Sequence, residues 1–207
     1  MTYSELVTLV KDLILSGVAI TGAIVAIKGL STWKRQLKGQ SEYELSRRIL
    51  VALFKYRDAI NGVRHPVMWD FEIPNPPEEE SKDMSREHIR FYGTSKAYQA
   101  RWDKVQAERT NLYADLLEGE AIWGGELKKL FKVLFNLEHE LLTSVRRYID
   151  LINPDKEEAS KEAIRNIEKK RRDIMYDDLS EEGDEYRKDF QLGVEEIEKY
   201  LKPKLTY

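Results

Sequence analysis

Residues 13–27 read LILSGVAITGAIVAI, fifteen consecutive positions without a charged side chain in a chain of 207 residues. A helix rises about 1.5 Å per residue, so this stretch spans about 22 Å, short of a hydrocarbon core of about 30 Å. Lys28 does not end the segment, because its aliphatic stem lets the ammonium group reach the headgroups. Continuing the helix to Trp33 gives adequate length and puts an aromatic ring where the interface is expected. The sequence therefore predicts one transmembrane helix, with these residues at the membrane interface: Lys28, Trp33, Lys34, Arg35 and Lys38.

Positive charge is concentrated at the same end of the chain. The net charge of −3 divides into five basic and two acidic residues in 1–40, against 29 basic and 35 acidic residues in 41–207. By the positive-inside rule, the basic cluster after the span places the N-terminus outside and residues 34–207 in the cytoplasm. A cleaved signal peptide is one alternative, but it would need a basic start and a small-x-small cleavage site. The buried core helix of a soluble protein is the other.

A second pattern lies within the predicted span. Small side chains recur at steps of three and four, on one helix face: Ser16, Ala19, Gly22, Ala23 and Ala26. Such faces let helix backbones approach closely in lipid, where packing is a principal source of helix–helix attraction. A single span has no second span of its own to meet that face, so we expect self-association into a homo-oligomer. The alternative is that Gly and Ala are simply frequent in membrane helices.

The sequence divides into a membrane anchor with its juxtamembrane segment (1–40) and a cytoplasmic helical domain (41–207). Ser41 and Glu44 form a capping box that predicts a new helix. Its apolar face is Leu45, Ile49, Leu53, Tyr56 and Ile60. Gly62 is a plausible end of that helix, and the proline-rich, acidic residues at about 63–83 predict a loop.

Four further segments have helical periodicity. The first begins near Met84, with a possible bend at Gly93 and an apolar stripe at Tyr98, Trp102, Val105, Leu112 and Leu116. The glycine pair 124–125 separates it from the clearest amphipathic helix in the chain, 126–153. Asn153-Pro154 predicts the start of a highly charged helix that reaches about residue 175 and projects into solvent. A last helix is expected over 184–201. We expect an all-α fold, with one transmembrane helix and a cytoplasmic bundle of about five helices.

Motifs for chemistry are mostly absent. The chain has no cysteine and three histidines, and it lacks the motifs Gly-x-Ser-x-Gly and His-Glu-x-x-His. It also lacks a phosphate-binding loop with its residues in the required order and spacing. We therefore expect no catalytic residue, metal or cofactor. The acidic net charge makes nucleic acid an unlikely partner. The basic run at 169–172 is expected to be the solvated surface of a helix.

Residues 29–60, GLSTWKRQLKGQSEYELSRRILVALFKYRDAI, resemble a group of uncharacterised single-pass bacterial membrane proteins. In that group an apolar N-terminus runs through a Trp-Lys/Arg-x-Gln-x-Lys-Gly segment into a helical domain. The architecture is also similar to the membrane accessory protein of RNA-targeting CRISPR systems, a single-span oligomeric pore with a degenerate HEPN-like domain. The resemblance implies the bacterial inner membrane, and it extends to the small-residue face and the juxtamembrane segment.

Three functional hypotheses follow. The leading one is an inner-membrane protein that self-associates and presents a helical interaction domain to a cytoplasmic protein partner. The first alternative is an oligomeric pore or membrane-disrupting effector in phage defence. The second is a HEPN-like ribonuclease, which the sequence disfavours because seven residues separate Arg57 from His65, whereas the motif has four to six. We accordingly expect a protein that is not an enzyme.

Overall fold

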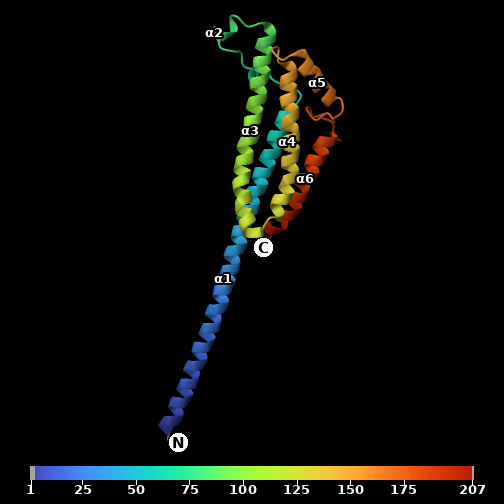
Figure 1. The fold of residues 1–207 in the computed structure, drawn as a ribbon. Coiled ribbons are helices and arrows are strands. Elements are labelled where there is room, and N and C mark those ends of the chain that lie inside the picture. The colour runs from blue at the N-terminus through green and yellow to red at the C-terminus, as the bar shows by residue number, and fades with distance from the viewer. Residues whose placement is uncertain (1–2, 207) are drawn as a thin grey trace.

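The computed structural model describes residues 3–206, without the side chains of residues 5–10, 12 and 13. Every element in this part of the chain is helical, which confirms the all-α prediction there (Figure 1). In chain order the elements are α1 (Tyr3–Arg64), η1 (Asp70–Glu72), α2 (Glu78–Ser81), α3 (Arg86–Trp123), α4 (Glu126–Ile152), α5 (Glu158–Glu168), α6 (Glu185–Leu201) and η2 (Lys202–Leu205). The first two residues of the predicted anchor lie outside the described residues, and Leu13, the first of the predicted span, is described by its backbone alone.

Helix α1 is one uninterrupted helix of 62 residues. Its N-terminal half extends away from the molecule as a rod, and its C-terminal half runs through the bundle (Figure 1). The prediction that a new helix opens at the Ser41–Glu44 capping box is therefore wrong. A helix can pass through capping residues when both flanks are helical, because a cap is worth only about 1 kcal/mol. Gly62 does not end the helix either, since α1 continues to Arg64.

The bundle consists of the second half of α1 together with α3, α4 and α6, which run alternately up and down (Figure 1). Helix α1 packs most extensively against α3, and α4 lies between α3 and α6. The predicted apolar face of α1 forms the centre of the core, and all five of its side chains are fully buried: Leu45, Ile49, Leu53, Tyr56 and Ile60. The stripe predicted for α3 is buried as well.

Local signals explain where several helices begin and end. The hydroxyl of Ser85 accepts a hydrogen bond from the His88 backbone amide, which caps the start of α3. Asp184 does the same for α6 through the Arg187 amide, as the predicted start near residue 184 requires. Gly124 has φ +76°, a conformation that glycine adopts without steric cost, and it turns the chain between α3 and α4.

Two predicted boundaries are wrong, and one predicted bend is absent. The helix expected from Asn153-Pro154 begins only at Glu158, because residues 154–155 form a turn in which the Lys156 amide donates to the Asn153 carbonyl, and Glu157 is the residue that precedes the helix. That helix ends at Glu168, so the basic run 169–172 lies in the following turn and not on a helix surface. Helix α3 passes through Gly93, whose missing side chain admits Ile73 from the preceding loop.

Candidate functional site

The apolar part of α1 is the most unusual surface of the molecule. Helix α1 is long and apolar enough to cross a membrane, and none of the most apolar window is buried. Its large side chains are about half to two-thirds exposed, for example Ile14 at 61%, Val18 at 66% and Ile27 at 69%. Exposure of so large an apolar surface to water is unfavourable at about 25 cal/mol per Å². This half of α1 is therefore an apolar surface that its own chain leaves uncovered.

The five predicted oligomerisation residues all lie on this exposed segment: Ser16, Ala19, Gly22, Ala23 and Ala26. No heavy atom outside the local helix backbone lies within 4 Å of where a side chain on Gly22 would begin. The three large apolar residues that follow at steps of three and four are also exposed: Leu30 at 51%, Trp33 at 57% and Leu37 at 47%. The small face thus continues without a break into an apolar face that reaches almost to the bundle.

The predicted interface residues follow in the same rod. Lys28, Lys34 and Arg35 are exposed, and Trp33 lies among them. Lys38 is exposed too, with its Nζ 3.8 Å from a carboxylate oxygen of Glu42 one turn on. An exposed ion pair at this distance contributes little, so these cations remain available to solvent or to anionic groups.

Glu138 holds α1 in the bundle through hydrogen bonds halfway along the bundle. This buried carboxylate accepts a hydrogen bond of 2.6 Å from the Tyr56 hydroxyl of α1. Its second oxygen accepts one of 2.6 Å from Arg109 Nη1 of α3. Burial raises the pKa of Tyr56 far above its ordinary value, and the charge of Glu138 raises it further. The arrangement joins α1, α3 and α4 through one satisfied buried charge.

Arg64 fixes the far end of α1. Its side chain is only 1% exposed, although arginine is rarely buried. It donates hydrogen bonds to the backbone carbonyls of Ile174 and Tyr176, at 2.8 and 2.9 Å. It also donates one of 2.6 Å to the Asp184 carboxylate, and its guanidinium lies 4.5 Å from the centre of the Tyr186 ring. Arg64 therefore holds the whole connection between α5 and α6 against the end of α1.

Arg101 does the same for the loop between α1 and α3. Its guanidinium donates to the carbonyls of His65 and Val67, at 2.9 and 2.7 Å. It also forms a two-pronged pair with Glu72, at 2.9 and 2.6 Å. The predicted loop is consequently ordered by a buried cation from the helix that follows it.

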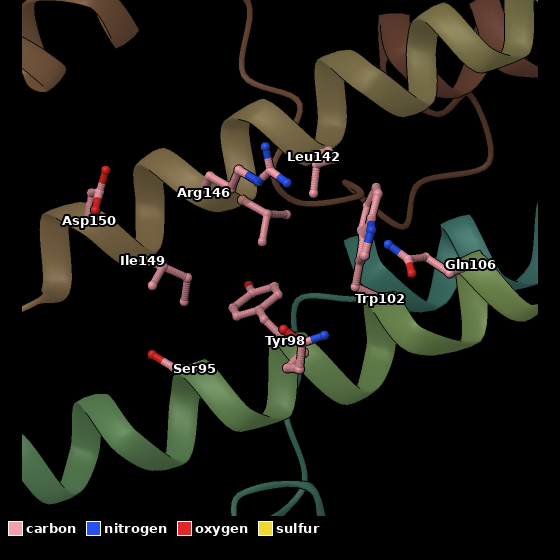
Figure 2. A pocket seen from close by; sticks show the side chains of 10 residues that line it. Ser95, Tyr98, Trp102, Gln106, Leu142, Arg146, Ile149 and Asp150 are labelled. Carbon is pink, nitrogen blue, oxygen red and sulfur yellow. The ribbon is translucent and has the colours of Figure 1, made fainter.

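A groove of about 570 Å³ lies between α3 and α4. Tyr98, Trp102 and Val145 form its apolar part, and Arg146 and Asp150 contribute charge from α4 (Figure 2). Ser95 belongs to it as well, and its buried hydroxyl has no hydrogen-bond partner in the described structure. This is a concave surface of mixed character, suited to a polypeptide or another amphipathic ligand.

The residues considered for catalysis are engaged locally. Arg57 pairs with the adjacent Asp58 at 2.9 Å and stacks on Phe54, whereas the His65 ring contacts Val67. Among the described residues, no group of three or more acidic or histidine side chains is arranged to hold a metal ion. In the basic run, Arg172 is paired with Glu140 and Asp189, which ties the turn to the bundle.

The buried charges were not expected from the sequence, but their positions contained a signal. Arg64 lies four residues after Ile60 and continues the apolar stripe of α1. Glu138 lies four residues after Leu134 on the stripe of α4. A charged residue at a stripe position marks either a break in the stripe or a buried polar contact, and here it marks a contact.

Comparison with protein-family models, with curated proteins and with solved structures found no match to this chain.

Replacing Arg64 by methionine should lower the free energy of unfolding by about 3–5 kcal/mol, because Asp184 and two carbonyls lose their buried partner. Urea titration of the detergent-solubilised chain, followed by circular dichroism, would measure this. Arg57→Met is the matched control, since Arg57 forms only a partly exposed local pair. Equal losses in the two variants would contradict the role given to Arg64.

Stability should fall as pH rises above about 10, the ordinary pKa of tyrosine. Burial raises the folded-state pKa of Tyr56, Tyr98 and Tyr186, so the folded state keeps their protons longer than the unfolded state does. Their contribution is complete below the unfolded pKa and is lost as pH rises toward the folded values. Urea titrations across the alkaline range would measure it, and Tyr56→Phe should flatten the decline. Constant stability through this range would refute the argument.

Proposed function

We propose that the chain is a single-pass membrane protein that self-associates through its span and presents a helical bundle to a protein partner in the cytoplasm. One observation carries the proposal. The two halves of helix α1 have different surroundings. The half that lies in the bundle is buried by its own chain, whereas the other half exposes apolar side chains on every face. A helix that is apolar all round is suited to lipid.

The charge distribution supports the orientation. The exposed basic side chains of Lys34, Arg35 and Lys38 follow the apolar segment directly, and positive charge is retained on the cytoplasmic side. The bundle would then lie in the cytoplasm, with the N-terminus outside. The bacterial inner membrane follows from the resemblance of residues 29–60 to single-pass bacterial proteins.

Helix geometry supports self-association. Residues spaced alternately three and four apart lie along one face of the helix. We call this set the span seam: Ser16, Ala19, Ala23, Ala26, Leu30, Trp33 and Leu37. At 100° per residue, the seam points about 120° away from the face of α1 that the bundle covers. Parallel copies in contact along the seam would therefore carry their bundles outward, without a clash. Seam contacts with a 3.5-residue period are those of a left-handed helix pair.

The bundle supplies the surface for a partner. The α3–α4 groove combines an aromatic floor with one cation and one carboxylate from α4. Aromatic residues and arginine are enriched where proteins bind proteins. We propose that a cytoplasmic protein binds here, with self-association multiplying the number of sites at the membrane.

Membrane insertion is tested by extraction. The chain expressed in bacteria should remain in the membrane pellet after alkaline carbonate treatment and be released by detergent. Ile20→Lys with Ile24→Lys should move a large share to the soluble fraction, because a charge at mid-span costs about 3 kcal/mol. The matched control is Ile20→Val with Ile24→Val. Complete release of the unaltered chain by carbonate would refute the span.

Self-association is tested by size in detergent. Gly22→Leu with Ala26→Leu should weaken it about tenfold or more, because bulk on or beside the seam separates the backbones. Val18→Leu with Val25→Leu adds bulk about 110° away and should leave the size unchanged. Multi-angle light scattering gives the number of copies. A monomer in the unaltered chain would end the proposal, whereas a ring of six or more would favour the pore alternative.

A further inference from the structure

The end of the bundle nearest the rod is a distinct surface. It is formed by the α3–α4 turn and by the end of α6 with η2, and the C-terminus lies beside the point where α1 leaves the bundle (Figure 1). We call residues 120–129 and 198–204 the base. We propose that the base binds anionic phospholipid headgroups, an inference that rests on the proposed membrane insertion of α1.

The length of the rod brings the base to the membrane surface. Element η2 packs against α1, and Gly39 is the first residue of the rod to be partly covered by the bundle. Gly39 lies six positions after Trp33, which is a rise of about 9 Å in an α-helix. The headgroup region on each side of the hydrocarbon core is about 5–8 Å thick. With Trp33 at the interface and no flexible linker, the base lies against the headgroups.

The base carries the charge that such a position favours. Together with the rod residues 34–42 it contains eight basic and four acidic residues, whereas the rest of the chain contains 26 basic and 33 acidic residues. Lys128 and Lys129 pair with Glu120 and Glu126 at 2.9 and 2.7 Å, but both lysines are substantially exposed. Such exposed pairs are weak and exchange readily for a phosphate.

Lys204 has a different environment. Its Nζ lies 5.1 Å from the centre of the Trp123 ring and 4.7 Å from that of Tyr200. Trp123 Nε1 is buried and has no hydrogen-bond partner in the described structure. Tryptophan and tyrosine favour the headgroup level, where an apolar ring and a polar edge are both satisfied. A headgroup phosphate can draw the ammonium off the two rings.

Binding of the base to headgroups would set the tilt of α1 and therefore the orientation of the bundle. Membrane helices tilt by about 20° on average, which moves a point about 10–20 Å from the α1 axis by about 3–7 Å toward or away from the bilayer. Anionic lipid favours tilt toward the bundle, because each lysine near the surface gains about fivefold in binding. In neutral lipid the base has no such preference.

The absence of cysteine allows a direct test with the full chain. Thr206→Cys, labelled with a donor fluorophore, reports on the base, and Glu79→Cys in α2 reports on the opposite end. The chain is inserted in nanodiscs with an acceptor on a trace of headgroups, in phosphatidylcholine alone or with phosphatidylglycerol. Energy transfer from the base should rise with phosphatidylglycerol and fall in high salt, and it should change more than transfer from the distal label, which the length of the bundle keeps farther from the acceptors.

Substitutions identify the cations. Lys202→Gln with Lys204→Gln should shift the ratio of docked to undocked bundles about thirtyfold toward undocked. Lys169→Gln with Lys170→Gln removes the same charge from the turn after α5 and should change nothing. Transfer that is independent of lipid charge and salt in an inserted chain would overturn the docking inference alone. A chain that fails to enter the nanodiscs would overturn the proposed function and this inference together.

Discussion

The molecule depends on the unbroken backbone hydrogen bonding of α1. Its 62 residues pass from an exposed apolar rod into the centre of the core without a change of conformation. The core half is held at mid-height by the Tyr56–Glu138 contact and at its end by Arg64. The rod and the bundle are therefore joined by continuous helix, with no loop between Trp33 and Leu45.

Much of this fold could be predicted from periodicity. The stripe from Leu45 to Ile60 is buried in full, and the glycine pair and Asp184 divide the helices where expected. The errors came from short local signals. The Ser41–Glu44 box is compatible with a helix interior as well as with a helix start, and burial of the flanking face outweighs the small value of a cap. Asn153-Pro154 is typical of a helix start, but residues 154–155 form a turn and α5 begins four residues after Pro154.

The buried charged residues that hold α1 and the loops in place were harder to predict, because a charged side chain is normally exposed to solvent. Arg64, Arg101 and Glu138 are buried because each satisfies several partners at once, and those partners come from distant segments of the sequence. These residues and their partners come together only in the folded chain, so helical periodicity does not predict the pairing. The candidate span is the reverse case. Its composition alone indicated it, and the structure adds that its chain leaves it uncovered.

The two ends of the bundle differ in how their charged side chains are paired. At the far end, buried arginines hold the loops through several hydrogen bonds each. At the base, the lysines pair with surface carboxylates, with the partly buried Glu198 or with ring faces, and the lysines themselves are exposed. The exchangeable charges are therefore next to the rod, and the specific contacts are remote from it. In the proposed orientation, a continuous helix between the membrane and the bundle would carry the α3–α4 groove along with any change in its tilt.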